Sequence, residues 1–409
     1  MSARKTFPLM AKEKLWTKDF VFICMANFLI CFAFYLLLPI LPLYLIETFD
    51  ASQTLVGIIL SCYTVAALTI RPFSGFILDT FDRKKVYLLT YALFIIIFFG
   101  YTYSKLIALF ILFRILHGLV FGTVTTAGNT IVVDITPSAR RGEGLGYFGI
   151  ANNLSMAAGP MLALFMHNHY SYDAIFYTAI AFGFVGFVLA CLVKTPEKPC
   201  CKEKEPISLD RFFLKKGIIA GLSLMFLAIP YGMTTSYVAI YGQELGINSS
   251  MGLFFSIMAA GLIVSRLFSG QLVDKGRIPQ VISWGIGITI VAFFVFSALE
   301  PINRTNHTIC LALFFMVPAL LGVGYGMMFP AYNTLFVNLA PHNRRATASS
   351  TYLTSWDVGI GIGLVLGGNI AELTSTHALA YFAGFLSNSI ALFVFMRYAA
   401  PHFLKNKLR

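Results

Sequence analysis

The chain has 409 residues, 58% of them hydrophobic and only 12% charged, whereas a soluble domain carries about 25% charged residues. This composition excludes an ordinary soluble protein and places most of the chain in lipid. The net charge of +12 lies mainly in the connections between apolar segments, where it suits anionic lipid headgroups rather than nucleic acid.

Twelve apolar segments reach the length of a membrane-spanning helix, which needs about 20 residues. In chain order, their predicted limits are 19–46, 53–78, 85–104, 106–134, 142–167, 172–194, 217–243, 250–274, 278–299, 308–337, 345–371 and 376–399. Of the 30 Lys and Arg, only Lys105 and Arg304 fall in connections predicted to lie outside. The positive-inside rule therefore places both termini in the cytoplasm, and the predicted fold class is all-α with twelve transmembrane helices.

The sequence repeats itself. Segment 71–79 (RPFSGFILD) recurs as 266–274 (RLFSGQLVD), and 266 minus 71 gives an offset of 195. A second alignment pairs identical residues of 118–141 with those of 322–345, at an offset of 204. The second half has therefore gained nine residues, and the polar stretch Pro301–Thr308 is the expected place for them.

Residues 1–194 and 217–409 are thus predicted to be two pseudo-symmetric six-helix halves, joined by the charge-dense cytoplasmic linker 195–216. The other connections are short and leave no room for a catalytic domain. Repeats at this scale are typical of secondary transporters, whose halves rock around a central site.

The repeated element Gly75-x-x-x-Asp79-x-x-x-Arg83 resembles the signature loop between helices 2 and 3 of the major facilitator superfamily. Asp79 can sit near a helix N-terminus of the opposite half, where the helix dipole favours a carboxylate. In this family, the loop and an Asp in helix 4 form a charge network that latches the outward-open state. The resemblance therefore implies a conformational latch formed by Gly75, Asp79, Arg83, Asp134, Gly270, Asp274 and Arg277.

The latch is expected to be stronger in the first half, because the repeat counterpart of Asp134 is Asn338. A purely structural helix-end ion pair is the alternative interpretation of these charges.

The fourth segment contains Arg114-x-x-His117, similar to a second family motif in which the Arg is linked to proton movement. An Arg inside a span costs several kcal/mol unless it finds acceptors or water. His117 lies on the same helical face and could titrate near neutral pH. Both are candidates for proton coupling; the alternatives are a bond from Arg114 to backbone carbonyls and a packing role for His117.

The fifth segment contains Ser155, Gly159 and Pro160, and it resembles a motif of drug and sugar exporters that work as proton antiporters. The 204-residue offset gives Gly359 and Gly363 as repeat counterparts of Ser155 and Gly159. Small residues four apart permit close helix packing, which any close-packed membrane helix also needs. The run from Pro230 to Tyr241 is similar to bacterial arabinose efflux permeases.

Asp357 is the one acid near the centre of a predicted span, and its repeat counterpart is Asn153. A carboxylate there is costly, so a functional role is the default hypothesis. Asp357 is predicted to point toward its own half or the central cavity, as the protonation site or the ligand of a cationic substrate. Alternatively, it is a neutral carboxyl hydrogen-bonded to Thr354 or Trp356.

In the family that the chain resembles, helices 1, 4, 7 and 10 face the central cavity. Polar and aromatic residues that could line it are Asn27, Tyr35, Thr126, Asn129, Asn153, Tyr231, Thr235, Tyr332, Asn333 and Trp356.

The sequence as a whole predicts a proton-coupled exporter of a small organic compound, such as a drug, sugar or metabolite, working by alternating access. A nutrient importer or proton symporter is the alternative, followed by a membrane sensor or an intramembrane enzyme. No phosphate-binding loop, metal motif or catalytic triad stands out, so we expect no cofactor, no metal and no enzyme activity. The expected setting is a monomer in the lipid of a bacterial inner membrane.

Overall fold

The computed structural model describes residues 14–51, 53–167, 169–196, 211–247 and 251–408. Within these ranges the chain forms helices and no strands, and 12 helices are long and apolar enough to cross a membrane. The predicted all-α fold class with twelve transmembrane helices is confirmed. Most of the predicted linker, residues 197–210, lies outside the described part of the chain.

The first bundle contains α1 (Lys18–Leu37), α2 (Ile40–Phe49), α3 (Gln53–Thr80), α4 (Arg83–Tyr103), α5 (Ile107–Ile135), α6 (Arg141–His167) and α7 (Tyr172–Leu192). The second contains α8 (Ile218–Glu244), α9 (Met251–Asp274), α10 (Ile278–Ser297), α11 (Leu299–Thr305), α12 (His307–Leu339), α13 (Arg345–Thr374), α14 (His377–Val394) and α15 (Ala400–Asn406). Short helical turns at Ser138–Arg140, Lys215–Gly217, His342–Arg344 and Phe395–Ala399 join or extend these helices.

Two boundaries differ from the sequence prediction. The first span, expected over 19–46, breaks into α1 and α2 at Leu38 and Pro39, because proline has no backbone N–H to continue the helical ladder. The extra residues around Pro301–Thr308 contribute to α11 and the start of α12, and no helix corresponding to α11 lies between α4 and α5.

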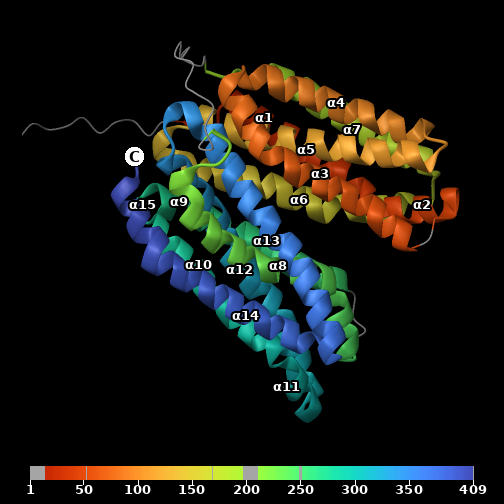
Figure 1. The fold of residues 1–409 in the computed structure, drawn as a ribbon, viewed down its shortest axis with the longest axis vertical. Helices are drawn as coiled ribbons and strands as arrows, with labels where there is room; N and C mark the ends of the chain where they lie inside the picture. Colours follow the sequence, from red (N-terminus) through yellow and green to blue (C-terminus); the bar gives the residue numbers. More distant parts are fainter. Residues whose placement is uncertain (1–13, 52, 168, 197–210, 248–250, 409) are drawn as a thin grey trace, which may run out of the picture.

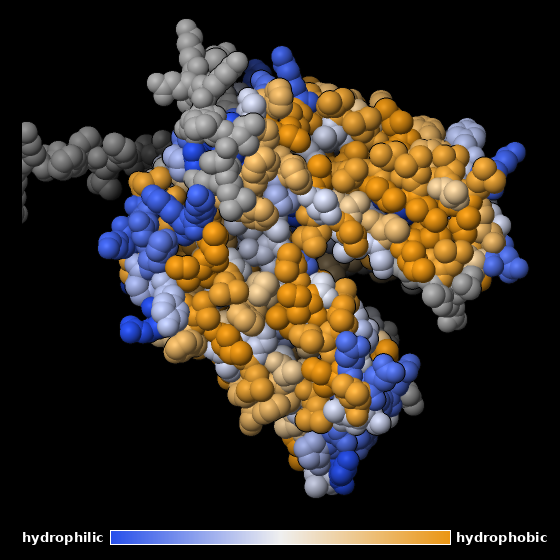
Figure 2. Space-filling model, viewed as in Figure 1, coloured by the Kyte–Doolittle hydropathy of each residue, from blue (hydrophilic) through white to orange (hydrophobic). Residues whose placement is uncertain are grey.

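The two bundles form a V (Figure 1). They meet at the end where α3 and α13 approach each other, and they diverge toward the ends that carry α2 and α11. Each bundle has its own hydrophobic core, and the space-filling view shows a deep hollow between them (Figure 2). The molecule therefore has a closed end and an open end.

Two helix pairs form most of the contact between the bundles: α3 packs against α13, and α6 packs against α9. Glycines permit both approaches. A Cβ added at Gly75 would lie 2.9 Å from Thr347 Cα, and a Cβ added at Gly270 would lie 2.7 Å from Glu143 Cα. The two crossings are related by the sequence repeat, since Gly75 and Gly270 are 195 residues apart.

We expect Gly75→Ala to lower the melting temperature of the purified protein, because the new methyl group must push α3 away from α13. Such overpacking costs about 1–3 kcal/mol. Gly361→Ala on α13 is the matched control, because a Cβ there meets nothing within 4 Å. Thermal unfolding followed by fluorescence measures both, and an equal melting temperature for the two variants would refute the close-approach role of Gly75.

Candidate functional site

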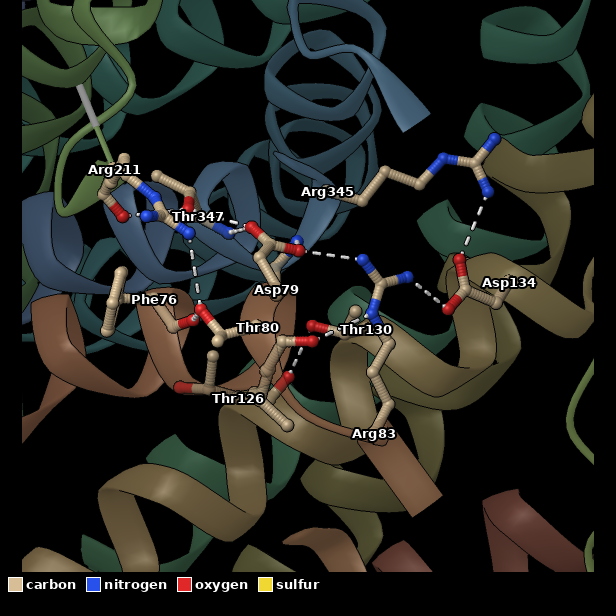
Figure 3. Close-up of polar contacts among 12 residues, drawn as sticks. Phe76, Asp79, Thr80, Arg83, Thr126, Thr130, Asp134, Arg211, Arg345 and Thr347 are labelled. Carbon is tan, nitrogen blue, oxygen red and sulfur yellow. Dashed lines mark hydrogen bonds and ion pairs between the residues drawn. The ribbon is translucent and has the colours of Figure 1, made fainter. Parts of the chain in front are cut away.

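A buried charge network joins the bundles at the closed end (Figure 3). Asp79, near the end of α3, accepts hydrogen bonds from the backbone N–H groups of Ala346 at 3.2 Å and Thr347 at 2.8 Å. The Thr347 hydroxyl donates a further bond of 2.8 Å. These donors belong to the first turn of α13, where unpaired N–H groups and the helix dipole favour an anion. Asp79 therefore caps a helix of the opposite bundle.

Arg83 and Asp134 extend this network. Arg83 Nη2 lies 2.7 Å from Asp79 Oδ1, and Arg83 Nη1 lies 2.5 Å from Asp134 Oδ2. Asp134 Oδ1 accepts a bond of 3.1 Å from Arg345 Nη1 on the opposite bundle. All four side chains are at most 9% exposed, so the loss of one partner would leave a buried charge uncompensated.

The second half carries a weaker version of this network, between α9 and α6. Asp274, at the end of α9, accepts bonds from the backbone N–H groups of Gly142 at 2.7 Å and Glu143 at 3.0 Å, in the first turn of α6. Arg277 is exposed at the start of α10, and no ion pair to it is found among the described residues. Asp274 therefore caps α6 without the buried arginine pairs of Asp79 and Asp134.

A second ion pair joins the bundles deeper in the membrane span. The Asp357 carboxylate on α13 pairs with Arg71 Nε on α3, and Arg71 Nη1 lies 3.4 Å from the Thr125 hydroxyl. The Arg71 side chain is 8% exposed and that of Asp357 is 25% exposed. The partner of Asp357 is thus an arginine of the first half. Thr354 Oγ1, the alternative partner, is buried and has no hydrogen-bond partner in the ranges that the structure describes.

Sequence reasoning missed Arg71, Arg345 and Thr347. The sequence did point to Arg71, because Arg71 and Arg266 are the first residues of the two repeated segments. Arg345 and Thr347 had a weaker one, namely their position at the start of the helix that carries Asp357.

Arg114 and His117 are buried inside the first bundle, with 2% and 1% exposure. The Arg114 guanidinium lies 4.5 Å from the Tyr63 ring centroid, and His117 Nδ1 lies 2.9 Å from the Tyr101 hydroxyl. Arg114 precedes Thr125, the contact of Arg71, by eleven residues, or about 16 Å along α5. The structure therefore does not bring this pair to Asp357.

The predicted cavity residues fall into four groups. Tyr231 and Trp356 are half-buried and their rings are 4.9 Å apart, within an aromatic cluster that also contains Phe329 and Tyr325. Asn129 on α5 and its repeat counterpart Asn333 on α12 exchange hydrogen bonds of 3.4 and 2.8 Å between the two bundles. The remaining residues bond within one bundle or are packed in it: Asn27, Tyr35, Thr126, Thr235 and Tyr332. Asn153 lies on α6, and its buried Nδ2 atom has no hydrogen-bond partner in the described part of the chain.

The predicted packing residues lie where helices of one bundle touch. The Ser155 hydroxyl on α6 donates to the Phe28 carbonyl of α1 at 2.8 Å, and a Cβ at Gly159 would lie 2.8 Å from Tyr35 Cβ. Pro160 follows within α6. In the second bundle, Gly359 and Gly363 bring α13 against the α8 backbone.

Comparisons with known proteins agree with this architecture. The family model described as Major Facilitator Superfamily matches residues 23–364 and 276–408. The staphylopine export protein of Staphylococcus aureus is 21% identical over 86% of this chain and 89% of its own length. The quinolone resistance protein NorA of the same species is 23% identical over 85% and 88%. A bacterial homologue of the iron transporter ferroportin, solved in an outward-facing state, has 16% identity and a TM-score of 0.77 over 93% of this chain and 99% of its own.

Proposed function

Since the chain belongs to the Major Facilitator Superfamily, whose members are membrane transporters rather than enzymes, we propose that it exports a small organic compound in exchange for protons. The ion pair of Arg71 and Asp357 is the observation that carries this proposal. It joins the two bundles through a carboxylate that a proton can neutralise, and a quarter of that carboxylate side chain is exposed. Export rather than import is supported by the relatives, which are an export protein and a resistance protein.

The closed end is proposed to face the cytoplasm. It carries the cationic starts of α4 and α6, whereas Lys105 and Arg304 lie at the opposite end. The positive-inside rule then makes this conformation open to the outside. The moving bodies are residues 1–194 and 217–409, connected by the linker 195–216, and the protein acts as a monomer in a bacterial inner membrane.

The network of Asp79, Arg83, Asp134 and Arg345 acts as the latch of the closed end. Its bonds must break before the cytoplasmic side can open, so it stabilises the outward-open state. Asp274 supports the same closure through α6, and Gly75 and Gly270 provide the close contact that both caps require.

Protonation of Asp357 provides the coupling. While it is charged, it attracts Arg71 and favours closure of the cytoplasmic end. A proton that enters from outside neutralises the carboxylate, weakens this attraction and favours opening to the cytoplasm. Release of the proton there restores the pair when the protein returns with its substrate. Arg114 and His117 remain candidates for the path by which protons move.

Transport into inverted membrane vesicles tests the proposal. A labelled quinolone is the first probe, followed by panels of sugars and metabolites. An acid-inside gradient should drive uptake, because protons leaving the vesicle exchange for substrate that enters. Uptake driven only by an acid-outside gradient would assign proton symport, and uptake of every probe without dependence on the gradient would contradict proton coupling.

A further inference from the structure

The two interfaces between the bundles differ in one charge. The 195-residue offset relates Arg71 to Arg266, and the 204-residue offset relates Asp357 to Asn153. Across the α3–α13 interface, the arginine meets a carboxylate. At the α6–α9 interface, the corresponding position holds a neutral amide. The second interface therefore keeps the cation of the repeat and lacks its anion.

Arg266 is buried against the opposite bundle, and no ion pair to it is found within the described part of the chain. It is 6% exposed, and its Nε and Nη1 atoms have no hydrogen-bond partner among the described residues. A Cβ added at Gly149 on α6 would lie 2.7 Å from the Arg266 Cζ atom, so the guanidinium lies directly on the α6 backbone. Asn153 follows Gly149 by four residues and thus lies on the same face of α6. Its Nδ2 atom is likewise buried without a partner.

An aromatic surface adjoins this cation. The Arg266 guanidinium carbon lies 5.5 Å from the Phe329 ring centroid, and the Phe329 ring lies 4.6 Å from the ring of Trp356. Trp356 and Tyr231 are half-buried, and Trp356 directly precedes Asp357 on α13. A planar apolar group could pack on these rings while an attached anion reaches Arg266.

We propose that Arg266 and Asn153 bind a carboxylate of the transported compound, whose aromatic or apolar body packs on Phe329, Trp356 and Tyr231. An arginine fork offers paired N–H donors that match a carboxylate, and the amide of Asn153 adds another donor. The substrate thus provides the negative charge that Asp357 provides at the other interface. This assignment rests on the proposed function, in which the hollow between the bundles carries the substrate, and it names the substrate class as organic acids.

Isothermal titration calorimetry on the purified full chain tests the assignment with matched acid and amide probes: acetate with acetamide, benzoate with benzamide, and 2-naphthoate with 2-naphthamide. We expect at least one aromatic acid to bind about tenfold or more tightly than its amide, since hydrogen bonds between charged groups are stronger than neutral ones. An absence of acid preference in all three pairs would overturn the proposal. Equally tight binding of potassium chloride would also overturn it, by assigning the site to an inorganic anion.

Two variants locate the preference. Arg266→Gln should remove the acid preference, and Asn153→Asp should remove it as well while raising the melting temperature, because it recreates the ion pair of the other interface. If Arg266→Gln does not fold, the acid preference measured for Asn153→Asp still tests the site. A preserved acid preference in either folded variant would overturn the site. Binding in detergent needs no proton gradient, so a failure of gradient-driven transport would leave this result standing, and a failure of acid binding would leave proton exchange standing.

Discussion

Asp357→Asn is expected to abolish gradient-driven transport in liposomes while substrate exchange without a gradient continues. Asparagine has nearly the size of aspartate, but it can neither bind a proton nor neutralise Arg71. The variant should therefore follow the substrate gradient alone, whichever pH gradient is imposed. Uptake of a labelled substrate, measured with and without a pH gradient, separates coupling from binding.

Glu372→Gln is the matched control for this result, because it removes a carboxylate from the same helix at an exposed position. It should transport like the unmodified protein. Loss of both gradient-driven transport and exchange in Asp357→Asn would indicate a structural role for the ion pair. Unchanged gradient-driven transport would refute Asp357 as the coupling group.

Asp79→Asn is expected to open the closed end of the molecule. The change removes the charge that accepts three hydrogen bonds from Ala346 and Thr347 and pairs with Arg83. Breaking such a buried pair costs about 3 kcal/mol or more, a large bias between two conformations. A cysteine at Ser350, which is buried and bonded to the Arg71 carbonyl, reports the opening in a background without the native cysteines. Maleimide labelling of that cysteine should become much faster in the variant.

Asp274→Asn is the matched comparison, because Asp274 caps α6 through two backbone N–H groups and lacks a buried arginine pair. Its effect on labelling should have the same direction and be smaller. Equal effects of the two substitutions would contradict the prediction that the latch resides mainly in the first half.

The fold could be predicted because its signals are local. Each span needs a long apolar run, so the twelve helices follow from short windows of sequence. The break at Pro39 is missed because hydropathy alone sets the limits of the span 19–46, and a proline does not interrupt an apolar run.

The candidate site could be predicted only where the repeat points to it. Asp79 and Asp274 stand out because their motif occurs twice, and Asp134 stands out through the resemblance to the family's charge network. The partner of Asp357 is 286 positions away in the chain, and choosing Arg71 requires the relative register of α3 and α13. No local pattern encodes that register. The lack of an ion pair at Arg266 is likewise visible only after both bundles are in place. The repeat alignment does show, however, that Asn153 occupies the position equivalent to Asp357.

Pulsed electron resonance distances between spin labels at positions 81 and 275 test the coupling of protonation to opening most directly. Both positions are exposed at the closed end, on opposite bundles. As the pH falls from about 7 to about 4, the range in which ordinary aspartate carboxyls begin to take up protons, the unmodified chain should shift toward longer distances. Asp357→Asn should show the long distances at every pH. An identical pH-dependent shift in both proteins would contradict the account.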